Sequence, residues 1–313
     1  MSSIFQTRRG FFYQDRYAVY IFLSHLLKND VKEFFTDFPL QGQKSIDVRL
    51  IDSQNIEKVF EVKTGEVFKL DLNAEIRDVF EVKTGEVFKL DLNAEIRDAV
   101  MDLYKYQKGK NNILPGLIVS RGLKPRISTY WDKIKGIQGY KRIAGEAKNS
   151  LDWLKKDLND SSLTDKELFD FSKILNLDDF DNDIKNNEHD EHCDADGKVI
   201  DLIRDIGNSI GVNAMEAEYH PRILMNDILF LCREYAGTAT NLYANILDAI
   251  TAYFARRIFL DKRFVPDGNN RDEAFREITD EVKNEFRIKL GILTDTQTQL
   301  ANNVSEGRKI KKL

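Results

Sequence analysis

Cysteine is scarce in this chain, and its scarcity excludes a disulfide framework. Only two of the 313 residues are cysteines. Cys193 and Cys232 stand in unrelated sequence contexts, whereas disulfide-rich secreted domains carry cysteines in even, regularly spaced sets. We therefore expect a chain that folds without disulfides in the reducing cytoplasm.

Long apolar runs are absent as well. The longest apolar stretches, around residues 17–27 and 246–260, are interrupted by polar or charged residues. Both are shorter than the roughly 20 apolar residues needed to cross a bilayer. Arg8 and Arg9 are not followed by a long apolar run, so no signal peptide is predicted. We expect a soluble, cytoplasmic protein without a membrane partner.

The chain also lacks a strong net charge and several familiar motifs. Lysine and arginine number 47 against 52 aspartates and glutamates, a net charge of −5, so any nucleic-acid binding would need a local basic patch. The sequence contains no GxSxG, Walker A or dinucleotide-binding fingerprint. Lipase, P-loop NTPase and Rossmann oxidoreductase functions therefore have no support.

The N-terminal part of the chain contains both helical and strand patterns. Apolar residues recur at helical spacing over residues 14–28, which predicts a helix. Residues 45–63 alternate apolar and polar side chains around turn-forming residues 53–55, which predicts a β-hairpin. A helix over residues 93–107 and a buried strand over residues 113–120 are predicted next.

An exact duplication interrupts this pattern. Residues 59–78 are repeated without a single change at residues 79–98. Solenoid repeats diverge and recur at least three times. Two identical copies therefore indicate a recent tandem duplication and not a repeat array.

The sign of the charge changes along the middle of the chain. Residues 121–148 are rich in Lys and Arg with aromatic residues between them. Such a segment suits contact with DNA phosphates and stacking on bases, or equally an ordinary charged helix face over buried aromatic residues. Residues 176–198 are acidic and polar enough to predict a mobile loop. The candidate DNA-binding residues are Arg121, Lys124, Arg126, Lys133, Lys135, Lys141 and Arg142.

Helical periodicity dominates the rest of the chain. We expect an α/β domain over residues 1–148, with a mixed sheet flanked by helices, and an all-α domain over residues 149–313 that binds partners or other copies of the chain. The predicted helices of the second domain include residues 199–210, 223–235, 241–257 and 272–290.

Three charged residues of the predicted hairpin form a candidate site. Asp47 lies on the first arm; Glu61 and Lys63 lie two positions apart on the second, so they point the same way. Phosphodiester hydrolysis uses a divalent cation that activates water, and Mg²⁺ prefers carboxylate oxygens. Asp47 and Glu61 are therefore predicted ligands for Mg²⁺ or Mn²⁺. Lys63 would stabilise the developing charge or orient the attacking water.

Two points about this site stay open from spacing alone. Charged residues alternate with apolar ones on the solvent face of many hairpins, and it is the surrounding helices, strand and basic segment that favour a nuclease. The duplication also supplies a second pair, Glu81 and Lys83. We favour Glu61 and Lys63, because residues 53–55 make a short hairpin connection to them.

The order of these motifs resembles a known family. Residues 10–15, GFFYQD, open the first helix, Asp47 lies on one strand and Phe60-Glu61-Val62-Lys63 on the next. Over about residues 8–125 this resembles the PD-(D/E)xK endonuclease domain of bacterial anti-phage defence. The resemblance implies a restriction-endonuclease-like fold, metal ligands at Asp47 and Glu61, and a catalytic lysine at Lys63. It implies a site-lining or a packing role for Tyr13 and Gln14, and we favour packing for Tyr13.

The resemblance also implies partners. Related domains occur in CBASS double-stranded-DNA endonucleases with nucleotide sensors and in the nuclease subunit of Lamassu, an SMC-type system. No region here resembles a cyclic-nucleotide sensor, so the layout is more similar to the Lamassu subunit. The implied partners are double-stranded DNA, an SMC-like ATPase and a small accessory subunit. We expect partners to hold the nuclease inactive and self-association into a homo-oligomer to activate it. The alternative is a non-catalytic helical interaction subunit with a degenerate nuclease fold, inactivated by the duplication.

Overall fold

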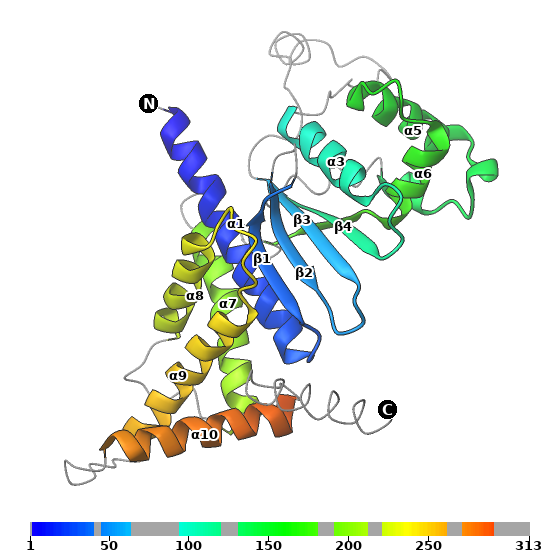
Figure 1. Ribbon diagram of the computed structural model, residues 1–313. Helices are drawn as coiled ribbons and strands as arrows, with labels where there is room; N and C mark the ends of the chain where they lie inside the picture. The colour runs from blue at the N-terminus through cyan, green and yellow to red at the C-terminus, as the bar shows by residue number, and fades with distance from the viewer. Residues whose placement is uncertain are drawn as a thin grey trace, which may run out of the picture. The chain divides into compact units, whose positions relative to one another are not determined.

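A computed structural model of the chain shows its secondary structure and packing (Figure 1). It describes residues 2–40, 45–63, 94–119, 131–180, 191–211, 221–261 and 271–290. Residues 64–93, which include the end of the first copy and most of the second, lie outside this description. None of the helices in the described ranges has the length and apolar character needed to cross a membrane.

Five strands form one mixed sheet (Figure 1). Their order in the sheet follows their order in the chain. The last two strands are parallel, with Gly116 opposite Asn176. The predicted hairpin and the predicted buried strand are confirmed. The strands are β1 (Glu33–Phe38), β2 (Ile46–Ile51), β3 (Glu57–Lys63), β4 (Ile113–Val119) and β5 (Asn176–Asp179).

The turn between β2 and β3 is stabilised by Asp52. Its Oδ1 accepts hydrogen bonds from the main-chain N–H groups of Gln54 (2.9 Å) and Ile56 (2.8 Å). Asn55 adopts a left-handed conformation with φ of 62°. Aspartate favours such turns because its carboxylate bonds the backbone two residues on, and asparagine tolerates positive φ. This turn therefore connects β2 directly to β3.

Helices α3 (Ala94–Gln107), α5 (Gly145–Leu158) and α6 (Asp165–Ile174) pack around a shared core with β4 (Figure 1). The predicted helix over residues 93–107 is confirmed as α3. It is followed by Gly109 at φ of 78°, a conformation that glycine adopts without steric cost. The core includes Ile46, Val59, Val100, Leu103, Leu117, Trp131, Leu154, Phe171 and Leu177.

Tyr13 ties the ends of β4 and β5 together. It comes from α1 (Ser2–Leu27), and its hydroxyl donates to the carbonyl of Val119 (3.0 Å) and accepts from the N–H of Phe180 (3.2 Å). Its ring meets the Phe180 ring edge to face at 5.6 Å. The packing role predicted for Tyr13 is confirmed.

The predicted mobile loop over residues 176–198 is wrong at both ends. Residues 176–179 are strand β5, and α7 begins at Glu191. The four residues of β5 are largely polar, but pairing with β4 satisfies their backbone groups, and composition alone does not reveal such pairing. Residues 149–313 are therefore not all helical.

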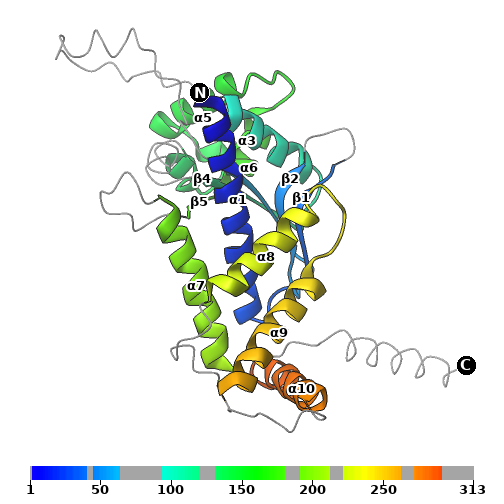
Figure 2. The same ribbon diagram turned by 90° about the vertical axis from the view of Figure 1, so that its left-hand side faces the viewer.

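Four further helices follow, as the apolar periodicity predicts. They are α7 (Glu191–Ser209), α8 (Arg222–Glu234), α9 (Tyr243–Asp261) and α10 (Arg271–Leu290). Helix α9 packs on both α8 and α10, and α7 packs on α8 (Figure 2). The helical character predicted for this region is confirmed.

The chain divides into two compact units. Unit 1 comprises Met1–Gln14, Leu40–Asp47 and Lys58–Glu188; unit 2 comprises Asp15–Pro39, Val48–Glu57 and His189–Leu313. Residues 149–188 therefore belong to the unit that contains Asp47, Glu61 and Lys63. The nuclease domain expected over residues 1–148 and the partner-binding domain expected over residues 149–313 stay a prediction.

Candidate metal centre

Lys63 brings the two predicted carboxylates together. Asp47 lies on β2, and Glu61 and Lys63 lie on β3, which the sheet places beside it (Figure 1). The Lys63 Nζ atom lies 2.7 Å from Glu61 Oε2 and 3.1 Å from Asp47 Oδ2. The three residues that the sequence singles out therefore meet at one ammonium group.

Asp47 is held by two further hydrogen bonds. The main-chain N–H of Val62 donates to Asp47 Oδ2 at 2.7 Å. On the other oxygen, Gln14 Nε2 from α1 donates to Oδ1 at 3.2 Å. Each oxygen of this carboxylate thus has a donor of its own, so the plane of the carboxylate is fixed. Gln14 lines the site, which the resemblance left open.

The two carboxyl groups of this cluster are buried, which makes their negative charges costly. Asp47 and Glu61 are 8% and 3% exposed. Burial, reinforced by the negative charge of Asp47 and opposed by Lys63, raises the pKa of Glu61 to about 8. Burial lowers the pKa of Lys63, but the carboxylates of Asp47 and Glu61 outweigh it and raise the pKa above its usual range. Lys63 therefore stays protonated. A second positive charge beside the two carboxylates would stabilise their ionised forms.

The donor set fits a divalent cation. Glu61 Oε1 is buried and has no hydrogen-bond partner among the described residues. A buried carboxylate oxygen without a donor is costly, and a bound cation would satisfy it. Mg²⁺ is commonly held by one or two carboxylates, with water and substrate oxygens completing its shell. Asp47 and Glu61 match that number, and nowhere in the described ranges do three or more His, Cys, Asp or Glu side chains gather as a metal site.

The structure uses the two copies of the duplication for different elements. β3 ends at Lys63 in the first copy, whereas α3 begins at Ala94 in the second. The extra residues that the duplication adds therefore lie in the sequence between Lys63 and Ala94. Glu81 and Lys83 lie outside the described residues.

A contact just before the first copy explains this choice of strand. Arg49 Nε donates to Glu57 Oε1 at 2.5 Å, and the Arg49 guanidinium lies over the rings of Phe35 and Phe38. The residue at the equivalent place before the second copy is Arg77. Pairing the second copy with β2 would set Arg77 against Arg49 and replace an attraction with a repulsion. This signal is present in the sequence, in the residues that precede each copy.

Gly116 on β4 allows β3 to pack closely at the site. A Cβ atom at this position would lie 2.5 Å from Cδ1 of Phe60, far inside van der Waals contact. Phe60 directly precedes Glu61, so the close contact of its ring with Gly116 helps to set the position of the strand that carries Glu61 and Lys63.

The predicted DNA-binding residues differ in their surroundings. Arg121, Lys124 and Arg126 lie outside the described residues. Lys133 forms an ion pair with Glu146 at 3.0 Å, and Lys135 is partly buried. Lys141 and Arg142 are exposed on the short helix η1 (Tyr140–Arg142). Of the four described members of the patch, Lys133, Lys141 and Arg142 are exposed to solvent.

The two aromatic residues of this segment that the structure describes, Trp131 and Tyr140, pack in or against the core. Trp131 is fully buried, so the interpretation that it stacks on an opened base is wrong. Tyr140 meets the Phe169 ring edge to face at 5.8 Å and packs against the core. The burial of these rings follows from neighbours far away in the sequence.

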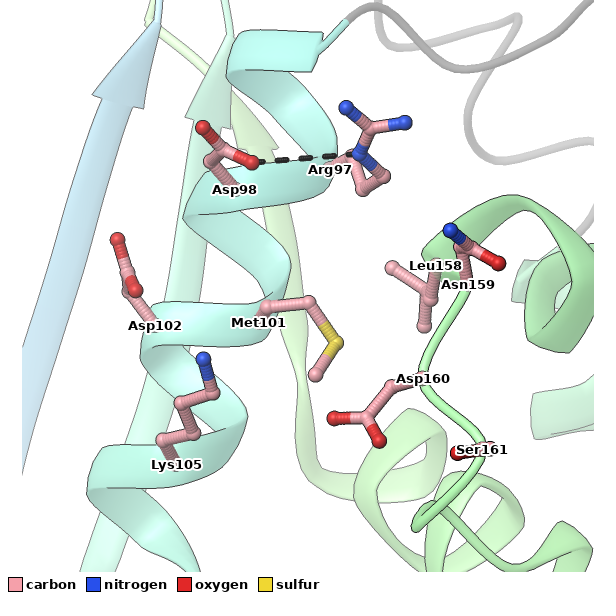
Figure 3. A pocket seen from close by; sticks show the side chains of 9 residues that line it. All are labelled: Arg97, Asp98, Met101, Asp102, Lys105, Leu158, Asn159, Asp160 and Ser161. Carbon is pink, nitrogen blue, oxygen red and sulfur yellow. Dashed lines mark ion pairs between the residues drawn. The ribbon is translucent and has the colours of Figure 1, made fainter.

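A pocket of about 470 Å³ lies between α3 and the loop after α5 (Figure 3). Asp98 and Asp102 extend from one side of α3, and Met101 and Asp160 project toward the space between the two segments (Figure 3). The negative charge of Asp102 adds to the rise in the pKa of Glu61. None of the predicted catalytic residues lines this pocket. Its lining residues are Arg97, Asp98, Met101, Asp102, Lys105, Leu158, Asn159, Asp160 and Ser161.

Comparison with known proteins identifies no relative of this chain. The chain matches no protein-family model, no curated protein and no solved structure.

Proposed function

We propose that this chain is a metal-dependent endodeoxyribonuclease that hydrolyses phosphodiester bonds of double-stranded DNA with Mg²⁺ or Mn²⁺. One observation carries the proposal. Two buried carboxylates share the ammonium group of Lys63, and one carboxylate oxygen of Glu61 has no partner among the described residues. The two carboxylates thus form a possible binding site for a cation, and Lys63 adds a fixed positive charge beside it. Phosphodiester hydrolysis uses this combination.

Each residue has a distinct role in this proposal. A bound cation would polarise a phosphoryl oxygen and activate water. Asp47 and Glu61 would hold it, while Gln14 and the Val62 N–H keep the Asp47 carboxylate oriented. Lys63 stabilises the charge that develops on the phosphate. Because its pKa is raised, Lys63 keeps its proton, which argues against a role as general base.

The finer assignments are supported by the resemblance of the motifs. We propose a restriction-endonuclease-like nuclease domain, and Lys141 and Arg142 as exposed contacts to phosphates. The cellular role would be that of a cytoplasmic effector of anti-phage defence. An SMC-like ATPase and a small accessory subunit would restrain it, and release into a homo-oligomer would activate it. Helices α7 to α10 would provide the surface for these partners.

Cleavage of supercoiled plasmid DNA tests the proposal. We expect nicking or linearisation that requires Mg²⁺ or Mn²⁺ and that falls by about 100-fold or more in Lys63→Ala, the range for losing one group that stabilises transition-state charge. Asp47→Asn and Glu61→Gln should abolish cleavage. The assay is run on each oligomeric species separated by size, because a restrained enzyme cuts only when assembled.

The competing function is a non-catalytic interaction protein that retains the fold. No metal-dependent cleavage by any separated species, with or without DNA present during assembly, would favour it. Cleavage that persists unchanged in Asp47→Asn would also contradict the proposal, because the activity would then come from another site or from a contaminant.

A further inference from the structure

Helix α8 carries apolar side chains on its exposed side. Phe230 is 63% exposed and Ile223 is 42% exposed, and Phe230 is the most exposed of the large apolar residues that the structure describes. The two residues are seven positions apart, about two turns of an α-helix, so they lie on one line along α8. The opposite side of α8 is buried, and the helix packs on α7, α9 and β1 (Figure 2). Packing within unit 2 therefore already uses the other side of the helix.

A line of acidic residues runs beside this apolar line. Asp227 and Glu234 are exposed and are also seven positions apart. Asp227 follows Ile223 by four residues, as Glu234 follows Phe230, and residues four apart are neighbours on the surface of a helix. Within the described part of the chain, neither acidic side chain forms an ion pair or a hydrogen bond. These two carboxylates therefore give the exposed side of α8 a negative charge that is not neutralised.

The two arginines on the exposed side of α8 are already paired. Arg233 Nε lies 2.6 Å from Asp15 Oδ2, and Arg222 Nη1 lies 3.8 Å from Asp196 Oδ2. All four residues belong to unit 2. The charge that α8 offers to a partner is therefore negative, and it is complementary to a basic surface.

A second copy of this face is a poorer partner than a basic helix. If two copies of α8 ran antiparallel about a two-fold axis, the acidic line of one would face the acidic line of the other. In a parallel pair, the acidic lines would meet Arg222 and Arg233, which already have partners in unit 2. The spacing of seven residues is the repeat of a coiled coil, which favours a helix as the occupant.

We propose that the exposed face of α8, formed by Ile223, Asp227, Phe230 and Glu234, docks a basic amphipathic helix of a partner protein. Apolar residues of that helix cover Ile223 and Phe230, and its Lys or Arg side chains pair with Asp227 and Glu234. The inference goes beyond the proposed function, because it concerns unit 2 alone and involves neither a metal ion nor DNA cleavage.

A synthetic peptide labelled with fluorescein serves as the probe. It consists of heptad repeats with Leu at the two core positions and Lys at the flanking positions, so its like charges keep it from pairing with itself. Fluorescence anisotropy measures its binding to the full-length chain. A peptide with Glu in place of Lys is the reference. We expect saturable binding of the Lys peptide, and binding of the Glu peptide that is weaker by about 10-fold or more, because like charges would meet.

Matched variants locate the apolar part of the binding surface. Phe230→Ala should weaken binding of the Lys peptide by about 10-fold or more, because a few large anchors dominate the binding energy of an interface. Ile288→Ala is the control. Ile288 lies on α10 with 58% of its side chain exposed, and its loss should leave binding unchanged.

A second pair of variants tests the charges. Asp227→Asn together with Glu234→Gln should weaken binding several-fold. The control removes one Asp and one Glu charge from α10, with Glu273→Gln and Asp280→Asn, which are also exposed and seven positions apart. Both double variants change the net charge equally, so they weaken non-specific attraction to the basic peptide equally. A larger loss in the α8 variant therefore measures contacts on α8.

Several outcomes would overturn the inference. They are no binding of the Lys peptide, equal binding of the two peptides, and equal losses in the α8 and α10 variants. Sedimentation of the chain alone tests the other occupant, because a lower mass for Phe230→Ala than for the wild type would show that a second copy covers α8. None of these measurements involves cleavage, so the inference and the proposed nuclease function can fail separately.

Discussion

The Oε2 atom of Glu61 lies 2.7 Å from Nζ of Lys63, yet the pKa of the carboxyl group is raised, because the lowering effect of this lysine is outweighed. Burial and the negative charge of Asp47 outweigh the lysine and raise the pKa of Glu61 to about 8. In the metal-free fold, Glu61 therefore holds a proton at neutral pH. A bound cation would take the place of that proton.

This shift predicts how metal-free stability depends on pH. A carboxyl group whose pKa rises on folding contributes stability that is fully present below its unfolded pKa and is lost as pH rises through its folded pKa. For Glu61 the window runs from 4.5 to about 8. With a chelator present to remove metal, the melting temperature of the wild type should fall across this pH window relative to that of Glu61→Gln. The variant has no titrating group at position 61. A difference in melting temperature that stays constant with pH would contradict the shift.

Metal binding should show the opposite trend. Because the cation displaces a proton from Glu61, affinity for Mg²⁺ should increase as pH rises toward about 8. Calorimetry at two pH values, in buffers of different ionisation enthalpy, would measure the released protons directly. We expect proton release in the wild type and none in Glu61→Gln. Binding in the wild type without proton release would show that Glu61 is already ionised.

The two copies of the duplication provide matched variants for strand choice. Lys63→Ala should lower cleavage by about 100-fold or more, whereas Lys83→Ala, the identical change in an identical local sequence, should leave it unchanged. Exchanging the preceding charges, with Glu57→Arg and Arg77→Glu together, should move the favourable partner of Arg49 to the second copy. Cleavage in that background should become sensitive to Lys83→Ala. Sensitivity that stays with Lys63 alone would show that Arg49 does not select the strand.

Removing one copy should preserve the fold. The first copy supplies β3 and the second supplies the start of α3, so deleting residues 79–98 joins the same two sequences through a shorter connection. Short connections cost less chain entropy. We expect a nuclease at least as active as the full chain, with an equal or higher melting temperature. A single-copy variant that cuts DNA more slowly would indicate that the extra segment contributes to the site.

Gly116→Ala tests the seating of β3. The new Cβ atom would lie 2.5 Å from the Phe60 ring, so either this ring or the strand that carries it and Glu61 must shift. Overpacking of this kind destabilises by about 1–3 kcal/mol, and cleavage should fall further than stability alone accounts for. Gly197→Ala is the control, because nothing lies within 4 Å of a Cβ there and alanine favours the helix by up to about 1 kcal/mol. Denaturant unfolding and cleavage rates measure both.

Local patterns were sufficient for most elements. The helical spacing over residues 14–28 and 272–290 and the alternation over residues 45–63 each depend on a few neighbouring side chains. The sequence alone therefore predicted α10, the β2–β3 hairpin and the second half of α1, which begins earlier than predicted, at Ser2. Glu61 and Lys63 stand two residues apart on one strand, and their meeting follows from strand periodicity. The same local logic placed Asp47 on the paired strand.

Contacts between distant residues decided the rest. β5 has a polar sequence, and only its pairing with β4 makes it a strand. Trp131 lies in a basic segment, but the core formed by remote elements buries it completely. The roles of Gln14 and of Gly116 depend on Asp47 and Phe60, which are far away in the chain. The spacing of residues along the chain does not reveal these contacts, because hydrogen bonds and close packing join groups that are near in space. Only the tertiary structure decides which residues far apart in the chain come close together.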